Sequence, residues 1–145
     1  MDRLHNLPGS DFLLPDPARF SAEQKQMRQP AYELDARRRA LVLEALKEAR
    51  LHKGWKLPAA HVRRTHIHVV VGAAEIPEKL MNHFKSYASR ALNNAGIDNR
   101  DRTRWSRHGS TRYLWKPEHV RAAIEYVVRG QGEAMAVWES NEPVG

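Results

Sequence analysis

The chain has 145 residues, with 24 Lys and Arg against 17 Asp and Glu, so its formal charge is +7 with the eight histidines neutral. It contains no cysteine, which excludes a disulfide scaffold, a cysteine-ligated zinc or iron–sulfur site and a thiol nucleophile. Because no apolar run is long enough to cross a membrane and no signal peptide is evident, we expect one soluble intracellular domain without a membrane partner. Its basic character favours a polyanionic partner.

Residues 1–34 differ from the rest of the chain and predict an irregular N-terminal arm, with one short helix over Ser21–Arg28. Five residues interrupt every regular pattern there: Pro8, Gly9, Pro15, Pro17 and Pro30. A disordered leader is the alternative. No strand is evident before the first predicted helix.

The middle of the chain predicts a helix followed by two strands. Asp35 is a suitable N-cap for a helix over 36–52, and Gly54 is placed to end it. Strands are predicted over 55–62 and 66–72, with a tight turn at 63–65. A second helix is predicted over 77–94, because Pro77 suits a first helical position.

The last third predicts two short strand pieces over 105–115 around a turn at His108–Ser110, then a helix from Pro117 to about Gly130. Residues 133–138 are predicted to be extended or irregular. The order of elements predicts an α+β fold in which helices cover one face of an antiparallel sheet over 35–138, before a tail at 139–145. A ferredoxin-like sheet needs one more strand at the start, and that strand is apparently missing.

The segment Thr65–Val71 carries the strongest candidate for chemistry. In a strand, residues two apart point to the same face, so Ile67 and Val69 would face the core while His66 and His68 project together from the other face. Two imidazoles held in this way can chelate a divalent cation. The alternative is two solvated histidines on an open sheet face. No His-Glu-x-x-His, Gly-x-Ser-x-Gly or glycine-rich phosphate motif is present.

A metal on a basic protein suggests phosphodiester chemistry, which needs an attacking nucleophile. Tyr126 lies about 110° from the centre of the apolar stripe of its predicted helix, on a flank that can face a neighbouring sheet. Tyr87 is predicted to be core, and Tyr113 to pack within a strand. From the residues alone, Tyr126 is either a nucleophile or a packing residue at the boundary of the core.

From about Ala31 to Trp138 the chain resembles the single-tyrosine HUH transposases, specifically the bacterial REP-associated tyrosine transposase type. The HUH motif, two histidines around a hydrophobic residue, is His66-Ile67-His68. The resemblance extends over several further segments: Trp55, Val62-Arg63, Pro77-Glu78-Lys79, Lys85–Arg90, Trp105–Trp115 and Tyr126–Gly132. It implies an HUH endonuclease type of fold and a cytoplasmic, nucleoid-associated bacterial protein.

The resemblance implies metal-dependent nicking and joining of single-stranded or hairpin DNA, as in DNA transposition and recombination. His66 and His68 would hold Mg²⁺ or Mn²⁺ on the scissile phosphate, and Tyr126 would form a 5′-phosphotyrosine intermediate. A polar ligand often follows the tyrosine by one helical turn, where this chain has Gly130. Gln131 is therefore the candidate third ligand. Glu133 and His119 are the alternatives.

The resemblance also implies a homodimer, whose partner would supply the missing edge strand. The expected DNA-binding residues are basic or aromatic: Arg63, Arg64, Lys85, Arg90, Arg100, Arg102, Arg104, Trp105, Arg107, His108, Arg112 and Trp115. The alternative places many of these arginines on a solvated face and the tryptophans in the core. Two other functions remain open: a non-catalytic, domesticated DNA-hairpin-binding protein and a basic RNA-binding module.

Overall fold

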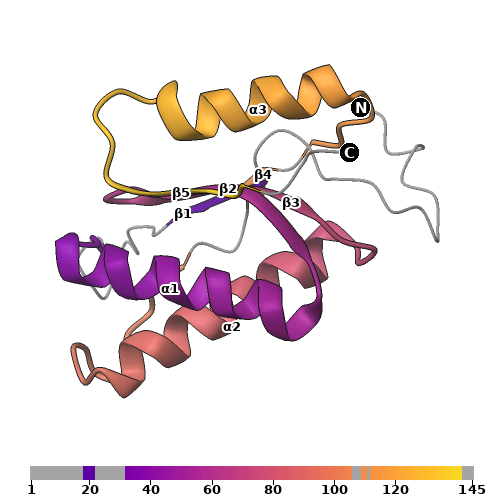
Figure 1. Ribbon diagram of the computed structural model, residues 1–145. Helices are drawn as coiled ribbons and strands as arrows, with labels where there is room; N and C mark the ends of the chain where they lie inside the picture. Colours follow the sequence, from indigo (N-terminus) through magenta and orange to yellow (C-terminus); the bar gives the residue numbers. More distant parts are fainter. Residues whose placement is uncertain (1–17, 22–31, 106–108, 111, 142–145) are drawn as a thin grey trace.

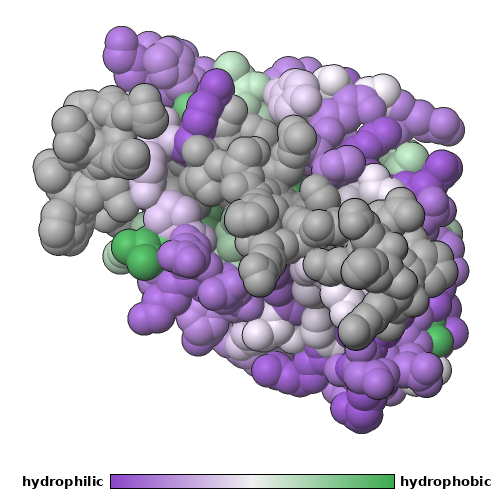
Figure 2. Space-filling view, turned by 180° about the vertical axis from the view of Figure 1, so that it is seen from behind, coloured by the Kyte–Doolittle hydropathy of each residue, from purple (hydrophilic) through white to green (hydrophobic). Residues whose placement is uncertain are grey.

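The computed structural model describes residues 18–21, 32–105, 109–110 and 112–141 (Figure 1). The elements follow the order β1 (Ala18–Ser21), α1 (Ala36–Lys53), β2 (Lys56–Val62), β3 (His66–Gly72), α2 (Pro77–Asn94), β4 (Gly109–Ser110), α3 (Pro117–Arg129) and β5 (Ala136–Glu139). None of the described helices is long and apolar enough to span a bilayer. On the face shown in Figure 2, hydrophilic residues predominate over the described surface.

One antiparallel sheet with the strand order β4-β1-β3-β2-β5 organises the fold. The first four strands have the order of a ferredoxin-like βαββαβ unit, and β5 extends that sheet beside β2. The predicted absence of a first strand is therefore wrong. Strand β1 pairs with β3, with Ala18 opposite Val69 and Ser21 opposite His66. Four residues are too few to show an alternating pattern in the sequence.

Residues 32–35, directly before α1, also belong to the domain rather than to a separate arm. The side chains of Tyr32 and Leu34 are buried in the core, and Leu34 N–H donates to the carbonyl of Arg64 at 2.8 Å. The helix predicted over 21–28 falls mostly outside the described residues. Strand β1 occupies the position beside β3, where the sequence predicted an open edge. A partner subunit is therefore not needed to cover that edge. The homodimer stays a prediction.

The helices lie on both faces of the sheet, which corrects the prediction that they cover one face. Helices α1 and α2 cover one side and α3 covers the other (Figure 1). Strand β3 shows why: Ile67 and Val69 enter the core under α1 and α2, whereas Val70 packs with Val127 of α3. A continuous run of apolar residues is typical of a strand that is covered on both faces.

Local signals set most helix boundaries. Asp35 caps α1 by accepting a hydrogen bond from the N–H of Arg38 at 2.9 Å, and Gly54 ends it with a φ of 72°. Helices α2 and α3 both begin at a proline. Helices α1 and α3 each bury one apolar face, but Tyr87 of α2, predicted to be core, is only half-buried. The turn predicted at 108–110 is wrong for Gly109–Ser110, which form β4.

Candidate functional site

His66 and His68 lie side by side on β3, on the sheet face that α3 covers. Their ring centroids are 6.2 Å apart and the ring planes differ by 32°. The side chain of His68 is 4% exposed and that of His66 is half-buried. The expectation that both histidines share a face is confirmed, and burial of His68 excludes a pair of fully solvated histidines.

Thr65 orients the ring of His66. Its Oγ1 lies 3.0 Å from His66 Nδ1. In the tautomer whose Nδ1–H donates to this hydroxyl, Nε2 carries the lone pair and is the nitrogen suited to a metal. Histidines that ligate metals ordinarily donate their other ring N–H in this way. The donor set therefore fits a divalent cation.

Tyr126 lies on α3, on the same side of the sheet as the histidine pair. Its side chain is 47% exposed, while its neighbour Val127 is completely buried. The tyrosine ring lies against Gly130, because a Cβ added at Gly130 would be 2.9 Å from Tyr126 Cδ1. Gly130, which stands where the resemblance leads us to expect a polar ligand, thus makes room for the ring of Tyr126.

His61, which no sequence motif singles out, lies on β2 directly opposite His68. It is 1% exposed. Its Nδ1 lies 2.9 Å from the carbonyl oxygen of Val127, and the N–H of Met135 donates to its Nε2 at 3.0 Å. Because a carbonyl can only accept and an N–H can only donate, Nδ1 carries the hydrogen and the ring is neutral.

The environment of His61 favours this neutral form. Burial lowers the pKa of His61 and the charge of Arg63 lowers it further, against the opposing effect of the bond to Val127. Both cationic repulsion and lost hydration disfavour an imidazolium here.

Gln131 follows the end of α3, where the helix stops at Arg129 and Gly130 is its C-cap. Its Nε2 donates to the carbonyl of Val127 at 3.3 Å, so it shares this acceptor with His61. The amide oxygen of Gln131 would be the ligand atom. Glu133 and His119 are exposed, and within the described residues no group of three His, Cys, Asp or Glu is placed to hold a metal.

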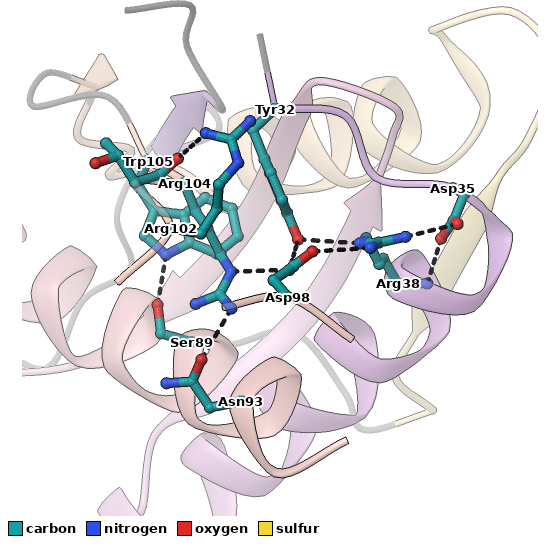
Figure 3. A network of polar contacts seen from close by, with 10 residues as sticks. Tyr32, Asp35, Arg38, Ser89, Asn93, Asp98, Arg102, Arg104 and Trp105 are labelled. Atoms are coloured by element: carbon teal, nitrogen blue, oxygen red, sulfur yellow. Dashed lines mark hydrogen bonds and ion pairs between the residues drawn. The ribbon is translucent and has the colours of Figure 1, made fainter. Parts of the chain in front are cut away.

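Two of the expected DNA-binding residues have structural roles instead (Figure 3). Arg104 is 4% exposed, and it donates to Asn93 Oδ1 at 2.9 Å and to Asp98 Oδ2 at 3.3 Å. Trp105 donates from its indole nitrogen to Ser89 Oγ at 2.8 Å. The prediction that Arg104 contacts DNA is wrong, because a buried guanidinium bonded to a carboxylate cannot reach a phosphate. Trp105 likewise packs against the core.

Asp98 is the centre of this network. Besides Arg104, it accepts hydrogen bonds from Tyr32 Oη at 2.6 Å and from Arg38 Nη2 at 2.8 Å. Burial raises the pKa of the Asp98 carboxyl, but the bonds from Arg38 and Tyr32 outweigh it and hold that pKa below its usual range. Burial and the bond to Asp98 raise the pKa of Tyr32. The network joins the segment before α1 to the loop after α2.

The remaining basic residues do not form one surface. Lys85 and Arg90 belong to α2, in the layer on the opposite side of the sheet from the histidine pair, and Arg90 lies over the ring of Tyr87 at 5.1 Å. Arg63 donates from Nη1 to the carbonyl of Glu133 at 3.0 Å. Four further candidates have exposed side chains: Arg64, Arg100, Arg112 and Trp115. Arg107 and His108 lie outside the described residues.

Comparison with known proteins supports the fold. No family model matches the sequence, and no curated protein matches it. A solved structure of a REP-associated tyrosine transposase bound to a REP hairpin superposes with a TM-score of 0.60, over 90% of this chain and 72% of that chain, at 10% identity. At this identity the likeness concerns the backbone alone. The chain is therefore a small α+β protein whose fold is similar to that of a tyrosine transposase.

Proposed function

We propose that this protein nicks and rejoins single-stranded DNA at hairpins, with Tyr126 as the nucleophile and His66 and His68 as metal ligands. The observation that carries the proposal is the placement of two adjacent imidazoles beneath the helix that presents an exposed tyrosine. The fold likeness to a transposase bound to a DNA hairpin supports the same chemistry. The net charge of +7 suits a polyanionic partner.

The reaction exchanges one phosphodiester for another. The phenol oxygen of Tyr126 attacks the phosphorus and loses its proton, and the bond from phosphorus to the 3′ oxygen breaks. The products are a 5′-phosphotyrosine and a 3′-hydroxyl, which takes up a proton. Attack of a 3′-hydroxyl on the phosphotyrosine reverses the step and restores the phenol. Because ester bonds are exchanged, no external energy source is needed.

Mg²⁺ or Mn²⁺ at His66 and His68 would supply a Lewis acid that polarises a phosphate oxygen. The chemistry of the donor set favours Mn²⁺ of the two, because imidazole nitrogen is a better ligand for Mn²⁺ than for the harder Mg²⁺. The amide oxygen of Gln131 and water would complete the set. Thr65 would keep the ring of His66 in the ligating orientation.

The test uses end-labelled hairpin DNAs with the intact protein, in Mn²⁺ or EDTA, analysed on denaturing gels. We expect a covalent adduct that requires Mn²⁺ and is absent from Tyr126→Phe, whose affinity for DNA is unchanged. Tyr87→Phe is the matched control, since it removes a hydroxyl on the other side of the sheet. An adduct with Tyr126→Phe would refute the assignment. Tight hairpin binding without any adduct would establish a non-catalytic binding protein.

A further inference from the structure

Two side chains, one within β2 and one directly after it, hold the connection between α3 and β5. Arg63 donates to the carbonyl of Glu133 at 3.0 Å. His61 engages the connection on both sides, at the carbonyl of Val127 and at the N–H of Met135. The segment between these contacts includes Gly130 and Gln131, which follow the proposed nucleophile.

The bond from His61 satisfies a carbonyl that the helix itself leaves open. The last four carbonyls of an α-helix have no partner within regular helix geometry, and α3 ends at Arg129. The carbonyl of Tyr126 accepts from the N–H of Gly130 at 2.9 Å, and that of Val127 accepts from His61 at 2.9 Å and from Gln131 at 3.3 Å. A residue of the sheet thus fixes the backbone next to Tyr126.

The bonds from His61 to Val127 and Met135 anchor the end of α3. The position of His61 in the sheet places this anchor next to the proposed metal site. His61 stands opposite His68 in the register of β2 and β3. It is 1% exposed, so it cannot touch DNA, and both ring nitrogens are engaged within the protein. Its bonds to Val127 and Met135 give it a route to Tyr126 through the backbone at the end of α3.

We propose that His61 is a positioning residue for Tyr126, which fixes the last turn of α3 relative to the strand that carries His66 and His68. This inference rests on the proposed function. A shift of about 1 Å in a reacting group can lower a rate by up to about 100-fold. Loss of the anchor is therefore expected to slow attack by Tyr126 without weakening DNA binding.

The test compares three substitutions of one buried ring. His61→Leu removes both bonds and keeps an apolar side chain. His61→Asn places an amide where Nδ1 lies and can still donate to Val127. His61→Gln places an amide nearer to Nε2 and can still accept from Met135. His52→Asn is the control, because His52 is an exposed histidine on the other side of the sheet.

The measurements are the rate of adduct formation at saturating hairpin DNA, the Kd for that DNA, and amide exchange over 126–135, all well below the melting temperature. We expect His61→Leu and His61→Gln to lose at least about tenfold in rate with the Kd unchanged. His61→Asn and His52→Asn should stay within about threefold of the wild type. Exchange at the end of α3 should accelerate in His61→Leu and not in His61→Asn.

Two outcomes overturn the proposal and are distinguishable. If the wild type forms adduct and all His61 variants form it equally fast, His61 does not position Tyr126, and the proposed function is unaffected. If the wild type forms no adduct, the proposed function fails, and His61 then has no reaction for which to position Tyr126. Rescue of the rate by His61→Asn is the result that a general loss of stability would not produce.

Discussion

Replacing Gly130 by alanine tests the placement of the tyrosine ring. Gly130 has a negative φ, −94°, so alanine meets no left-handed backbone strain there. In open space, such a change would stabilise a protein by about 0.4–1 kcal/mol. Here the new Cβ would lie 2.9 Å from Tyr126 Cδ1, 2.9 Å from its carbonyl oxygen and 3.0 Å from its Cα. Carbon atoms in comfortable contact are about 3.5–4.0 Å apart.

Turning the ring relieves one of these three contacts, but the other two involve backbone, so the end of α3 must also move. Overpacking of this kind costs about 1–3 kcal/mol. Alanine also lowers the conformational entropy of the unfolded chain, which offsets part of this cost. The free energy of unfolding should therefore fall by about 1–2 kcal/mol. The ring of Tyr126 would move by several tenths of an ångström or more, and the adduct rate should fall by about tenfold to 100-fold.

The assay pairs urea unfolding with adduct formation at saturating hairpin DNA. Gly96→Ala is the matched control, since Gly96 has a φ of 69° but no atom within 4 Å of an added Cβ. It should lose about 1 kcal/mol through backbone strain and keep the wild-type adduct rate. If Gly130→Ala is as stable and as fast as the wild type, the ring of Tyr126 does not lie over Gly130.

Three further results are expected. Asp98→Ala should lower the free energy of unfolding by about 3 kcal/mol in urea, because it leaves the buried guanidinium of Arg104 without its carboxylate, whereas the exposed Asp101→Ala should change it by less than about 0.5 kcal/mol. Because the pKa of His61 is lowered on folding, its unfolded form binds more protons, so stability should fall as the pH drops below 6.5, and His61→Asn should flatten that part of the profile. Mn²⁺ at 100 times its Kd should stabilise the wild type by about 2.7 kcal/mol, seen as a higher Tm that EDTA abolishes and His66→Ala lacks.

The helices could be predicted from the sequence because their signals are local. Asp35 and Gly54 bound α1 through their own side-chain and backbone chemistry, and the prolines at 77 and 117 begin the other two helices. The strand over 66–72 was predictable for the same reason, since β-branched residues dominate it. Each of these signals acts within a few residues of the boundary that it sets.

The first strand could not be predicted, because pairing rather than local propensity creates it. Residues 18–21 become a strand through hydrogen bonds to β3 and β4, which lie far away in the chain. The position of α3 on the second face of the sheet was not predicted either. The run Val69–Val71 nevertheless indicated it. Three successive apolar residues in a strand need cover on both faces.

The same distinction separates His66 and His68 from His61. A spacing of two along a strand brings the first pair together whatever the rest of the chain does. His61 acquires its role from Val127 and Met135, which are 66 and 74 positions away. No sequence pattern within β2 could predict such distant partners.

A count of arginines alone is a poor predictor of which ones contact DNA, and nearby acidic residues improve the prediction. Arg104 belongs to an arginine-rich stretch, yet Asp98, six positions earlier, binds it in the core. An acid within a basic segment is thus a signal that a neighbouring arginine has a structural partner. Arg64 has no acid within five positions in the sequence and its side chain is exposed. For Arg64, contact with DNA phosphate stays a prediction, and Arg64→Ala should weaken hairpin binding and its salt dependence together.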